Sequence, residues 1–430
     1  MLEWRRSSAR ALALGLLAVS SVHFAVSVHR AGAFGVVDFP IFLERARVFR
    51  DTGVLYPAAE DPAVYAPAAA VYKFPPPYAM LLLPFTTRAD EQRVLSGHRV
   101  VQVAAYLLAV GLLLHALAPR RPSAFWLLGL ALALNFEPFF ETLWRLQIET
   151  GLLLLLAIGV VALARERDGP LGAAIAAGAL LKIYPAVLAA YLVAGRRWRA
   201  LAALAVTAAL IGVSSWIVIG GAENRSYWLR VFPALLAELP AATTENVSPA
   251  RYLQTLSGLG PATAKRAATI LAGCLLVVSA WAVRWRAGRS TSAAHARLAF
   301  ALFVPAMLLS MPNGWVNYQL LLLVPLLALL AHATSESRDR TWVGWTIGAA
   351  VVPLLFYQPC APPEQGWPCA ATPPFLGLVE LPRAIHDAFV ALRGLSAPIV
   401  WVALLAVIVR SRAVPSREGE GGDGTAPPPR

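Results

Sequence analysis

Residues 36–77 read VVDFPIFLERARVFRDTGVLYPAAEDPAVYAPAAAVYKFPPP and separate two strongly apolar parts of the chain. This polar insert begins with an acid, Asp38, just after the first apolar part. An amphipathic stretch at 40–50 follows, and a segment rich in Tyr and Pro leads back to the apolar chain. An amphipathic helix beside apolar segments typically lies in the headgroup plane. The insert therefore predicts a membrane protein with a polar site at the lipid–water boundary.

The composition indicates a polytopic membrane protein of the all-α class. Of the 430 residues, 58% are hydrophobic and 14% are charged, whereas about a quarter are charged in an average soluble domain. Many apolar segments reach, or come close to, the roughly 17–25 residues that cross a bilayer as a helix. We therefore expect about twelve transmembrane helices, at 11–28, 76–87, 100–118, 123–140, 150–164, 171–194, 200–220, 266–283, 298–311, 318–333, 342–357 and 397–410.

The net charge of +13 comes largely from Arg-rich clusters at the ends of these segments, with Trp beside several of them. Cytoplasmic loops of membrane proteins carry such an excess of positive charge, and Trp anchors helices at the interface. The charge therefore indicates membrane lipids as partners and no nucleic acid. With clusters such as Trp4–Arg6 and Arg196–Arg199 inside, both termini are cytoplasmic, and the outer segments are 29–75, 221–261, the turn 312–316 and 358–396.

Two polar turns fit this topology poorly. The same count places Arg120–Arg121 and the turn Arg165–Asp168 on the outer side. The second turn is balanced by its acids, but the first runs against the charge rule. The topology of residues 97–165 is therefore the part that the charge pattern determines least.

We expect one transmembrane domain over residues 1–412 and a disordered cytoplasmic tail over 413–430. The tail is rich in Gly, Pro and charge, so it cannot bury a core. The basic start and Ala31–Ala33 resemble a cleavable leader. The apolar core is long for a leader, however, and its loss would break the inside–outside count, so we expect an uncleaved first helix.

The cysteine pattern predicts a disulfide within one loop rather than a metal site. Cys360 and Cys369 share a predicted outer loop, and their spacing suits a local disulfide in an oxidising compartment. The sequence has no Cys-x-x-Cys pair, and its His residues are scattered. We therefore expect no metal and no cofactor.

Asp38 and Lys182 are the strongest single candidates for a functional site. Asp38 shortly precedes Pro40, so a helix cap is the simpler interpretation and a site carboxylate is the alternative. Lys182 lies far from both ends of the apolar segment 171–194, where a charge is costly and marks a functional site by default. The alternative is a Lys that snorkels from a helix broken near Pro185.

Other polar residues gather near the predicted outer loops. A cluster at 137–149 includes Gln147, and a simple loop is the alternative interpretation there. The turn before Trp315 contains Pro, Asn and Gly, which on its own indicates only a tight turn. The remaining candidates in these regions are Tyr56, Tyr65, Lys73, Asn246, Ser248, Arg251, Asn317 and Tyr318.

Four stretches of the chain, taken in order, form a combined pattern. They are the Asp38 loop with Gly53–Tyr56 and Tyr65–Pro67, then Leu181–Pro185 with Arg196–Ala200, then Glu245–Ser248, and finally Met311–Tyr318. Together they resemble glycosyltransferase family 87, the polyprenol-phosphate-mannose-dependent α-(1→2)-mannosyltransferases among the C-type membrane glycosyltransferases. The resemblance spans roughly residues 1–335.

Two positions depart from the family pattern. The family's Gly-Gln-x-Asn element corresponds here to Leu146-Gln147-Ile148-Glu149, in which only the Gln is kept. The family's Ser-Trp-x-His turn ends here in Asn317, which cannot act as a base.

The resemblance implies the C-type glycosyltransferase fold, with interfacial helices in the outer loops. It implies transfer of a hexosyl residue, mannose in this family, from a polyprenyl-phosphate sugar to a hydroxyl of a glycolipid or glycan on the outer face of the plasma (inner) membrane. Asp38 would be the general base of an inverting displacement, and Lys182, Arg251 and Lys73 would bind the donor phosphate. The implied substrate-binding residues are Tyr56, Tyr65, Gln147, Asn246, Ser248, Trp315, Asn317 and Tyr318.

A transporter or flippase of a lipid-linked glycan intermediate is the alternative from another functional class. Its functional charges should lie in the middle of the bundle, and its outer loops should be short. Here the polar residues crowd the outer loops instead. A non-catalytic membrane scaffold, the third class, would not explain Lys182.

Overall fold

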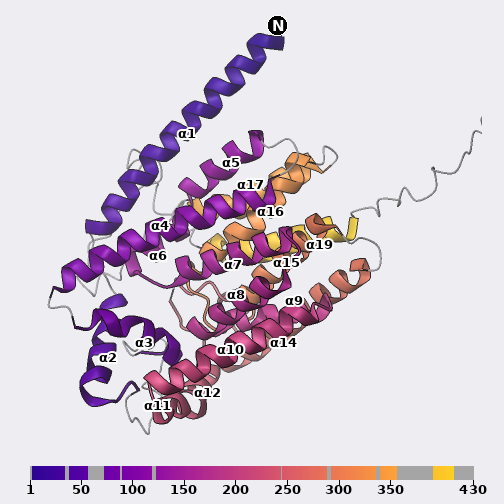
Figure 1. Cartoon of the computed structure of the whole chain (residues 1–430). Helices are drawn as coiled ribbons and strands as arrows, with labels where there is room; N and C mark the ends of the chain where they lie inside the picture. Colours follow the sequence, from indigo (N-terminus) through magenta and orange to yellow (C-terminus); the bar gives the residue numbers. More distant parts are fainter. Residues whose placement is uncertain are drawn as a thin grey trace, which may run out of the picture.

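The computed structural model describes residues 2–33, 38–56, 72–87, 90–118, 123–243, 245–287, 292–335, 339–355 and 391–410. In these ranges the chain is helical apart from short links and a single β-bridge between Asn246 and Trp315, which confirms the all-α class (Figure 1). The α-helices of the first half are α1 (Leu2–Ala33), α2 (Phe39–Thr52), α3 (Pro76–Leu82), α4 (Glu91–Leu117), α5 (Ser123–Leu134), α6 (Glu137–Arg145), α7 (Glu149–Ala164), α8 (Asp168–Leu181), α9 (Ala189–Ala194) and α10 (Trp198–Val218).

The second half continues in the same way. Its α-helices are α11 (Gly221–Ser226), α12 (Phe232–Ala237), α13 (Pro249–Ser257), α14 (Pro261–Ala287), α15 (Ala293–Leu309), α16 (Leu323–Ser335), α17 (Arg340–Leu355) and α19 (Ser396–Arg410). Shorter turns of other helical types join them. These are η2 (Leu83–Phe85), η3 (Tyr184–Leu188), η4 (Tyr227–Val231), η5 (Val316–Leu322) and η7 (Arg393–Leu395).

Among the described residues, seven helices are long and apolar enough to cross a membrane. Four shorter apolar helices accompany them. The expected number of twelve spans is therefore not reached by helices of full length. The seven candidates are Leu14–Ala31, Glu91–Leu117, Ala124–Arg145, Trp198–Val218, Pro261–Trp285, Val316–Ser335 and Arg393–Arg410.

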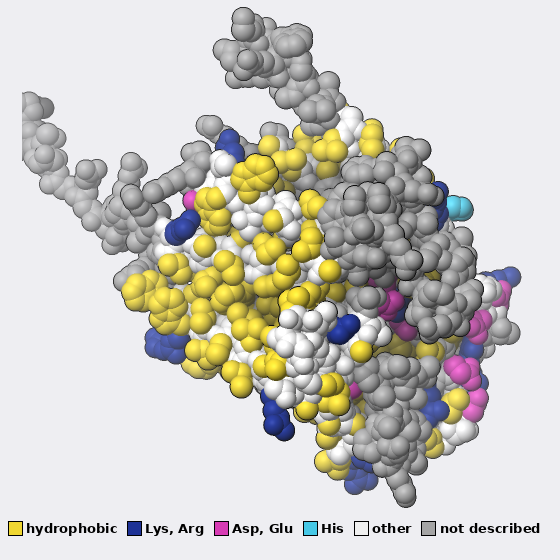
Figure 2. Space-filling model, turned by 180° about the vertical axis from the view of Figure 1, so that it is seen from behind, with side chains coloured by type: hydrophobic (Ala, Val, Ile, Leu, Met, Phe, Trp, Pro, Cys, Tyr) yellow, Lys and Arg dark blue, Asp and Glu magenta, His cyan; other side chains and the backbone are white. Residues whose placement is uncertain are grey.

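Burial separates the centre of the bundle from its lipid-compatible surface. The span Val316–Ser335 is 89% buried, whereas only 6% of the span Trp198–Val218 is buried. A helix that is apolar all round and enclosed by others is a central helix. Exposed apolar side chains of α10, such as Leu210 and Ile217, face outward. Figure 2 shows a broad apolar surface with Lys and Arg side chains at its margins, as expected of a surface covered by lipid.

The predicted span at 76–87 is wrong. These residues form α3 and η2, of seven and three residues, which are too short to cross a bilayer. Arg50 of α2 donates to the Thr86 carbonyl at 2.6 Å, and Arg47 pairs with Glu91 at the start of α4 at 2.9 Å. The start of α4 therefore lies at the same end of the bundle as α2, and the segment 76–87 does not cross to the other end.

The predicted single span at 171–194 is also wrong. Helix α8 ends at Leu181, Lys182 is extended with φ −155° and ψ 124°, and the chain continues through η3 into α9. Pro185 has no N–H to donate to the carbonyl of residue 181, so the helix cannot continue regularly through it. Asp168 and Arg197, which the charge count had placed on opposite sides, form an ion pair of 2.7 Å. The segment is therefore a helical hairpin that begins and ends on one side.

Helix α8 packs very closely on α10, and Gly172 makes this possible. A Cβ atom at Gly172 would overlap the backbone carbonyl of Ala200, whereas a Cβ atom at Gly212 of α10 would meet nothing within 4 Å. Overpacking of this kind typically costs about 1–3 kcal/mol. We expect Gly172→Ala to lower the temperature of thermal unfolding in detergent and Gly212→Ala to leave it equal or higher. Equal effects of the two substitutions would contradict the close crossing.

The first insert forms the expected amphipathic helix, α2. Its buried face consists of Phe39, Phe42, Leu43 and Ala46. After α2, the backbone N–H groups of Leu55 and Tyr56 both donate to the Glu223 carboxylate of α11 at 3.0 Å. A second stretch of the outer segment 221–261, residues 226–238, contains η4 and α12. Both stretches are thus helical and adjacent at one end of the bundle, and their orientation in the headgroup plane stays a prediction.

Candidate functional site

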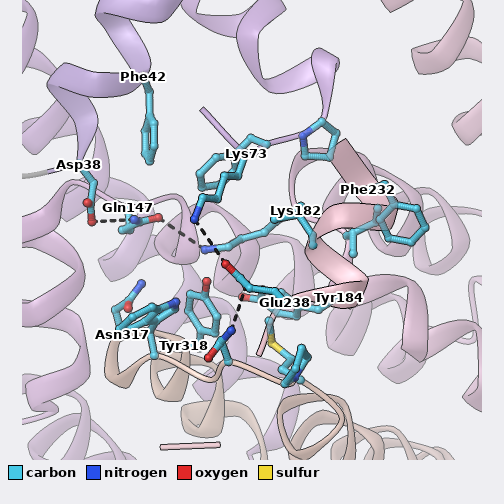
Figure 3. A pocket seen from close by; sticks show the side chains of 18 of the residues that line it. Asp38, Phe42, Lys73, Gln147, Lys182, Tyr184, Phe232, Glu238, Asn317 and Tyr318 are labelled. Carbon is cyan, nitrogen blue, oxygen red and sulfur yellow. Dashed lines mark hydrogen bonds and ion pairs between the residues drawn. The ribbon is translucent and has the colours of Figure 1, made fainter. Parts of the chain in front are cut away.

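One cavity of about 360 Å³ opens at the end of the bundle that carries α2, α3 and α12. Six stretches of the chain line it: the start of α2, the link before α3, the α6–α7 turn, the α8–η3 link, η4–α12 with the segment after it, and the turn between α15 and η5. The cavity is polar on the side of Asp38, Gln147 and Lys182, and apolar around Phe232 (Figure 3).

Asp38 faces this cavity and does not cap α2. It precedes the first residue of α2, but its side chain makes no capping hydrogen bond. The Gln147 amide donates instead from Nε2 to Asp38 Oδ2 at 2.8 Å, and Arg145 Nη1 lies 3.8 Å from the same oxygen. The simpler interpretation of Asp38, as a cap, is therefore wrong. The side chain is 22% exposed, so a ligand in the cavity can reach it.

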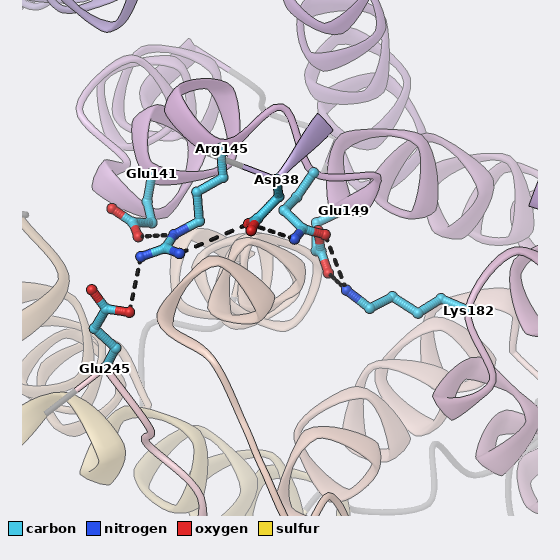
Figure 4. Close-up of polar contacts among 7 residues, drawn as sticks. Asp38, Glu141, Arg145, Glu149, Lys182 and Glu245 are labelled. Atoms are coloured by element: carbon cyan, nitrogen blue, oxygen red, sulfur yellow. Dashed lines mark hydrogen bonds and ion pairs between the residues drawn. The ribbon is translucent and has the colours of Figure 1, made fainter. Parts of the chain in front are cut away.

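Arg145 connects Asp38 with two further carboxylates (Figure 4). Its Nε lies 2.5 Å from Glu141 Oε1, and its Nη2 lies 2.9 Å from Glu245 Oε2. Glu141 is almost fully buried, with 1% of its side chain exposed. A buried carboxylate needs a cation and hydrogen bonds to offset desolvation. Arg145 supplies both, and so holds α6, the outer loop and Asp38 together.

Lys182 reaches the cavity from the break after α8. It forms an ion pair with Glu149, whose side chain is fully buried, and its Nζ lies 3.5 Å from Gln147 Oε1. The same Nζ lies 4.0 Å from the ring centroid of Tyr318, a favourable cation–π distance. Gln147 therefore bridges the two residues: its side-chain N–H donates to Asp38, and its side-chain oxygen accepts from Lys182.

The turn that presents Gln147 has an unusual backbone. Leu146 adopts a left-handed conformation with φ 50°, and the Gln147 N–H donates to the Thr142 carbonyl at 3.1 Å. Gln102 of α4 donates from its side chain to the Gln147 carbonyl at 2.9 Å. A non-Gly residue in this conformation is uncommon. It occurs at the position where the sequence departs from the family's Gly.

A second ion pair lies on the other side of the cavity. Lys73 Nζ is 3.5 Å from Glu238 Oε1, and Asn313 donates to Glu238 Oε2 at 3.0 Å. Burial lowers the pKa of Lys73, and the nearby Glu238 opposes that shift. Burial likewise raises the pKa of Glu238, and Lys73 opposes it. The pair is thus partly desolvated and readily perturbed by a third charge.

Asn246 and Ser248 lie behind the cavity wall rather than on it. Asn246 donates to Asn313 Oδ1 at 3.0 Å, and its own Oδ1 accepts from the N–H groups of Ser248 and Gly314, both at 3.1 Å. Ser248 caps α13 by accepting from Arg251 N at 3.3 Å. These bonds fasten the outer loop to the turn that carries Trp315, so the structure gives both residues a supporting position.

The other predicted residues divide into two groups. Trp315, Asn317 and Tyr318 line the cavity together with Asp38, Lys73, Gln147 and Lys182, whereas Arg251 and Tyr56 do not. Tyr56 is buried and donates to the Phe74 carbonyl at 2.7 Å. Outside the described residues lie Tyr65, Cys360, Cys369, most of the outer loop 358–396 and the tail 413–430.

Four further charged residues belong to the site and were not predicted as part of it: Arg145, Glu149, Glu238 and Glu245. A buried Lys requires a partner, so the depth of Lys182 could have pointed to an acid in the polar cluster at 137–149. No local signal distinguishes Glu238 from other acids of the outer loop. In the described part of the chain, no group of His, Cys, Asp and Glu side chains is arranged to hold a metal ion, and the expected absence of a metal stays a prediction.

Two comparisons identify relatives. Residues 72–312 match the family model described as glycosyltransferase family 87. A relative from Mycolicibacterium smegmatis is 28% identical over 327 residues, which cover 72% of this chain and 73% of the relative. That relative is a polyprenol-phosphate-mannose-dependent alpha-(1-2)-phosphatidylinositol pentamannoside mannosyltransferase. The family match favours a transferase over a transporter and spans Lys73, Gln147, Lys182 and Glu238. The chain belongs to glycosyltransferase family 87.

Proposed function

We propose that the protein transfers mannose from a polyprenyl-phosphate sugar to a hydroxyl of a glycolipid or glycan, with inversion at the anomeric carbon. The observation that carries this proposal is the cavity that brings Asp38, Lys73 and Lys182 together beside an apolar wall. The donor class of the mycobacterial relative supports the choice of mannose and of a glycolipid acceptor.

Asp38 acts as the general base. It accepts the proton of the acceptor hydroxyl while the new bond to the anomeric carbon forms and the bond to the phosphate oxygen breaks. Gln147 orients the Asp38 carboxylate through its 2.8 Å hydrogen bond. Lys182 and Lys73 face the charge that develops on the departing polyprenyl phosphate, and cations placed in this way lower the barrier.

The surroundings of Asp38 favour direct displacement. A retaining mechanism requires a second carboxylate about 5–5.5 Å from the first, placed to act as nucleophile. Asp38 forms an ion pair with Arg145, which also binds Glu141 and Glu245. Both of these acids are thus engaged by a cation. One base and an inverted product are the simpler outcome.

The reaction takes place on the outer face of the membrane. Helix α10 begins beside the Arg196–Arg199 cluster and ends at α11, next to Tyr56. The basic cluster and the cavity are therefore at opposite ends of this helix. Because basic clusters remain in the cytoplasm, the cavity opens outward in the plasma (inner) membrane.

The test is a transfer assay with the full chain in lipid nanodiscs. We expect transfer of mannose from a polyprenyl-phosphate mannose to an acidic glycolipid acceptor, and nuclear magnetic resonance of the product should show the inverted anomer. Nucleotide sugars offered alone should give no product. Transfer from a nucleotide sugar, or a product with retained configuration, would contradict the proposal.

A further inference from the structure

The Glu238 carboxylate occupies a small anion site on the cavity wall. One of its oxygens lies 3.5 Å from Lys73 Nζ, and the other accepts from Asn313 at 3.0 Å. Lys73 and Asn313 come from separate parts of the chain, and both line the cavity with Glu238. Figure 3 shows Lys73 and Glu238 in contact across the cavity, with Lys182 nearby. A cation and an amide N–H are the groups that also bind a phosphate oxygen.

The surface next to this anion site is apolar. Phe232, Leu235 and Leu236 line the cavity on the α12 side. Leu236 is also 57% exposed on the outside of the protein, and Leu239 is 49% exposed. An anionic headgroup at Lys73 thus has an apolar surface beside it that continues to the protein exterior. This combination suits a lipid phosphate better than a free phosphate.

Glu238 is held less firmly than the other acid that pairs with a cavity lysine. The Glu149 side chain is fully buried at the start of α7, where the helix dipole favours a carboxylate. Glu238 follows the last residue of α12, is 12% exposed and makes a long 3.5 Å contact with its lysine. Of the two acids, Glu238 is therefore the one that an arriving anion can displace.

We propose that Glu238 holds the place of the donor phosphate at Lys73 and Asn313, and that it takes up a proton from water when the phosphate binds. This inference rests on the proposed function, since it names the anion as the phosphate of a polyprenyl-linked donor. After transfer, the leaving polyprenyl phosphate departs as Glu238 loses its proton and pairs with Lys73 again. Glu238 thereby links donor binding and product release to one proton.

The charged and titratable groups around Glu238 are compatible with this exchange. They are Lys73 before α3, Lys265 on α14 and Tyr318 on η5. Burial already raises the pKa of Glu238, in spite of the two lysines. A bound phosphate adds a second negative charge close by, which raises that pKa further. Protonation is therefore the expected response.

The experiment measures binding of a short-chain polyprenyl methyl phosphate, a diester that keeps one charge and carries no transferable sugar. At about pH 8, Glu238→Gln should bind it about tenfold more tightly than the wild type. The reason is that the variant lacks the repulsion between the Glu238 carboxylate and the phosphate, and an interaction that shifts a pKa by about one unit changes affinity about tenfold. Towards about pH 5, wild-type affinity should rise as Glu238 takes up its proton, while that of the variant stays level. The matched control is Glu245→Gln, which removes another cavity carboxylate but not the one at Lys73.

Each outcome supports or overturns the proposal that Glu238 occupies the phosphate site until the donor binds. Equal or weaker binding by Glu238→Gln at the higher pH, parallel pH curves, or the same gain in Glu245→Gln would overturn the place-holder role. Should Glu238→Gln fail to fold, the wild type alone decides, because an affinity that is constant over this pH range also overturns it. If the wild type does not bind the diester at any pH, the proposed donor class itself is wrong.

Discussion

Asp38→Asn should reduce the rate of sugar transfer by about 10²- to 10⁴-fold, the usual contribution of a general base. The amide cannot take the acceptor proton, but its oxygen can still accept the 2.8 Å hydrogen bond from Gln147. Because Asp38 makes no capping bond in α2, the substitution should not unfold the helix. Donor affinity, measured with the non-transferable diester, should stay within about threefold of the wild type.

A matched control for this substitution lies on the same helix. Asp51→Asn changes an exposed acid that pairs with Arg50 at the far end of α2, and it should leave the transfer rate unchanged. If Asp38→Asn transferred mannose at a rate close to that of the wild type, Asp38 would not be the base. If both variants lost activity together with their yield in the membrane, the effect would lie in the stability of α2.

Lys182→Met should have two separable effects. It removes the partner of Glu149, which is fully buried. Breaking a buried ion pair in this way typically costs about 3–5 kcal/mol of stability. It also removes a charged hydrogen-bond donor to the substrate phosphate, typically about 1.5–3 kcal/mol, or roughly 10- to 100-fold in donor affinity. Thermal unfolding in detergent and diester binding measure the two effects independently.

The double variant Lys182→Met/Glu149→Leu distinguishes a structural from a functional lysine. The double variant no longer contains the Glu149 carboxylate that Lys182→Met leaves unpaired. Most of the stability lost in the single variant should therefore return, since replacing both members of a buried pair is often nearly neutral. Donor affinity should remain low, because the cation is still absent. A double variant that is stable and binds the diester normally would show that Lys182 only neutralises Glu149.

The local pattern of the sequence determined the fold class and much of the site. Apolar segments and their basic ends predicted an all-helical membrane protein, and the amphipathic stretch at 40–50 predicted α2. Asp38, Gln147 and Lys182 were singled out as polar residues beside or within apolar segments, and they meet in one cavity. Such predictions succeed because periodicity, burial and the cost of a buried charge act over a few residues.

The tertiary structure alone decided which charges form pairs and where the short helices turn back. Lys73 and Glu238 are 165 positions apart in the chain, and Asp38 and Gln147 are 109 apart. Residues 76–87 and 171–194 were apolar enough to suggest spans, but the ion pairs Arg47–Glu91 and Asp168–Arg197 bring their ends to one side. Hydropathy reports how well a segment tolerates lipid. Whether that segment crosses or returns depends on long-range contacts that no local stretch of sequence contains.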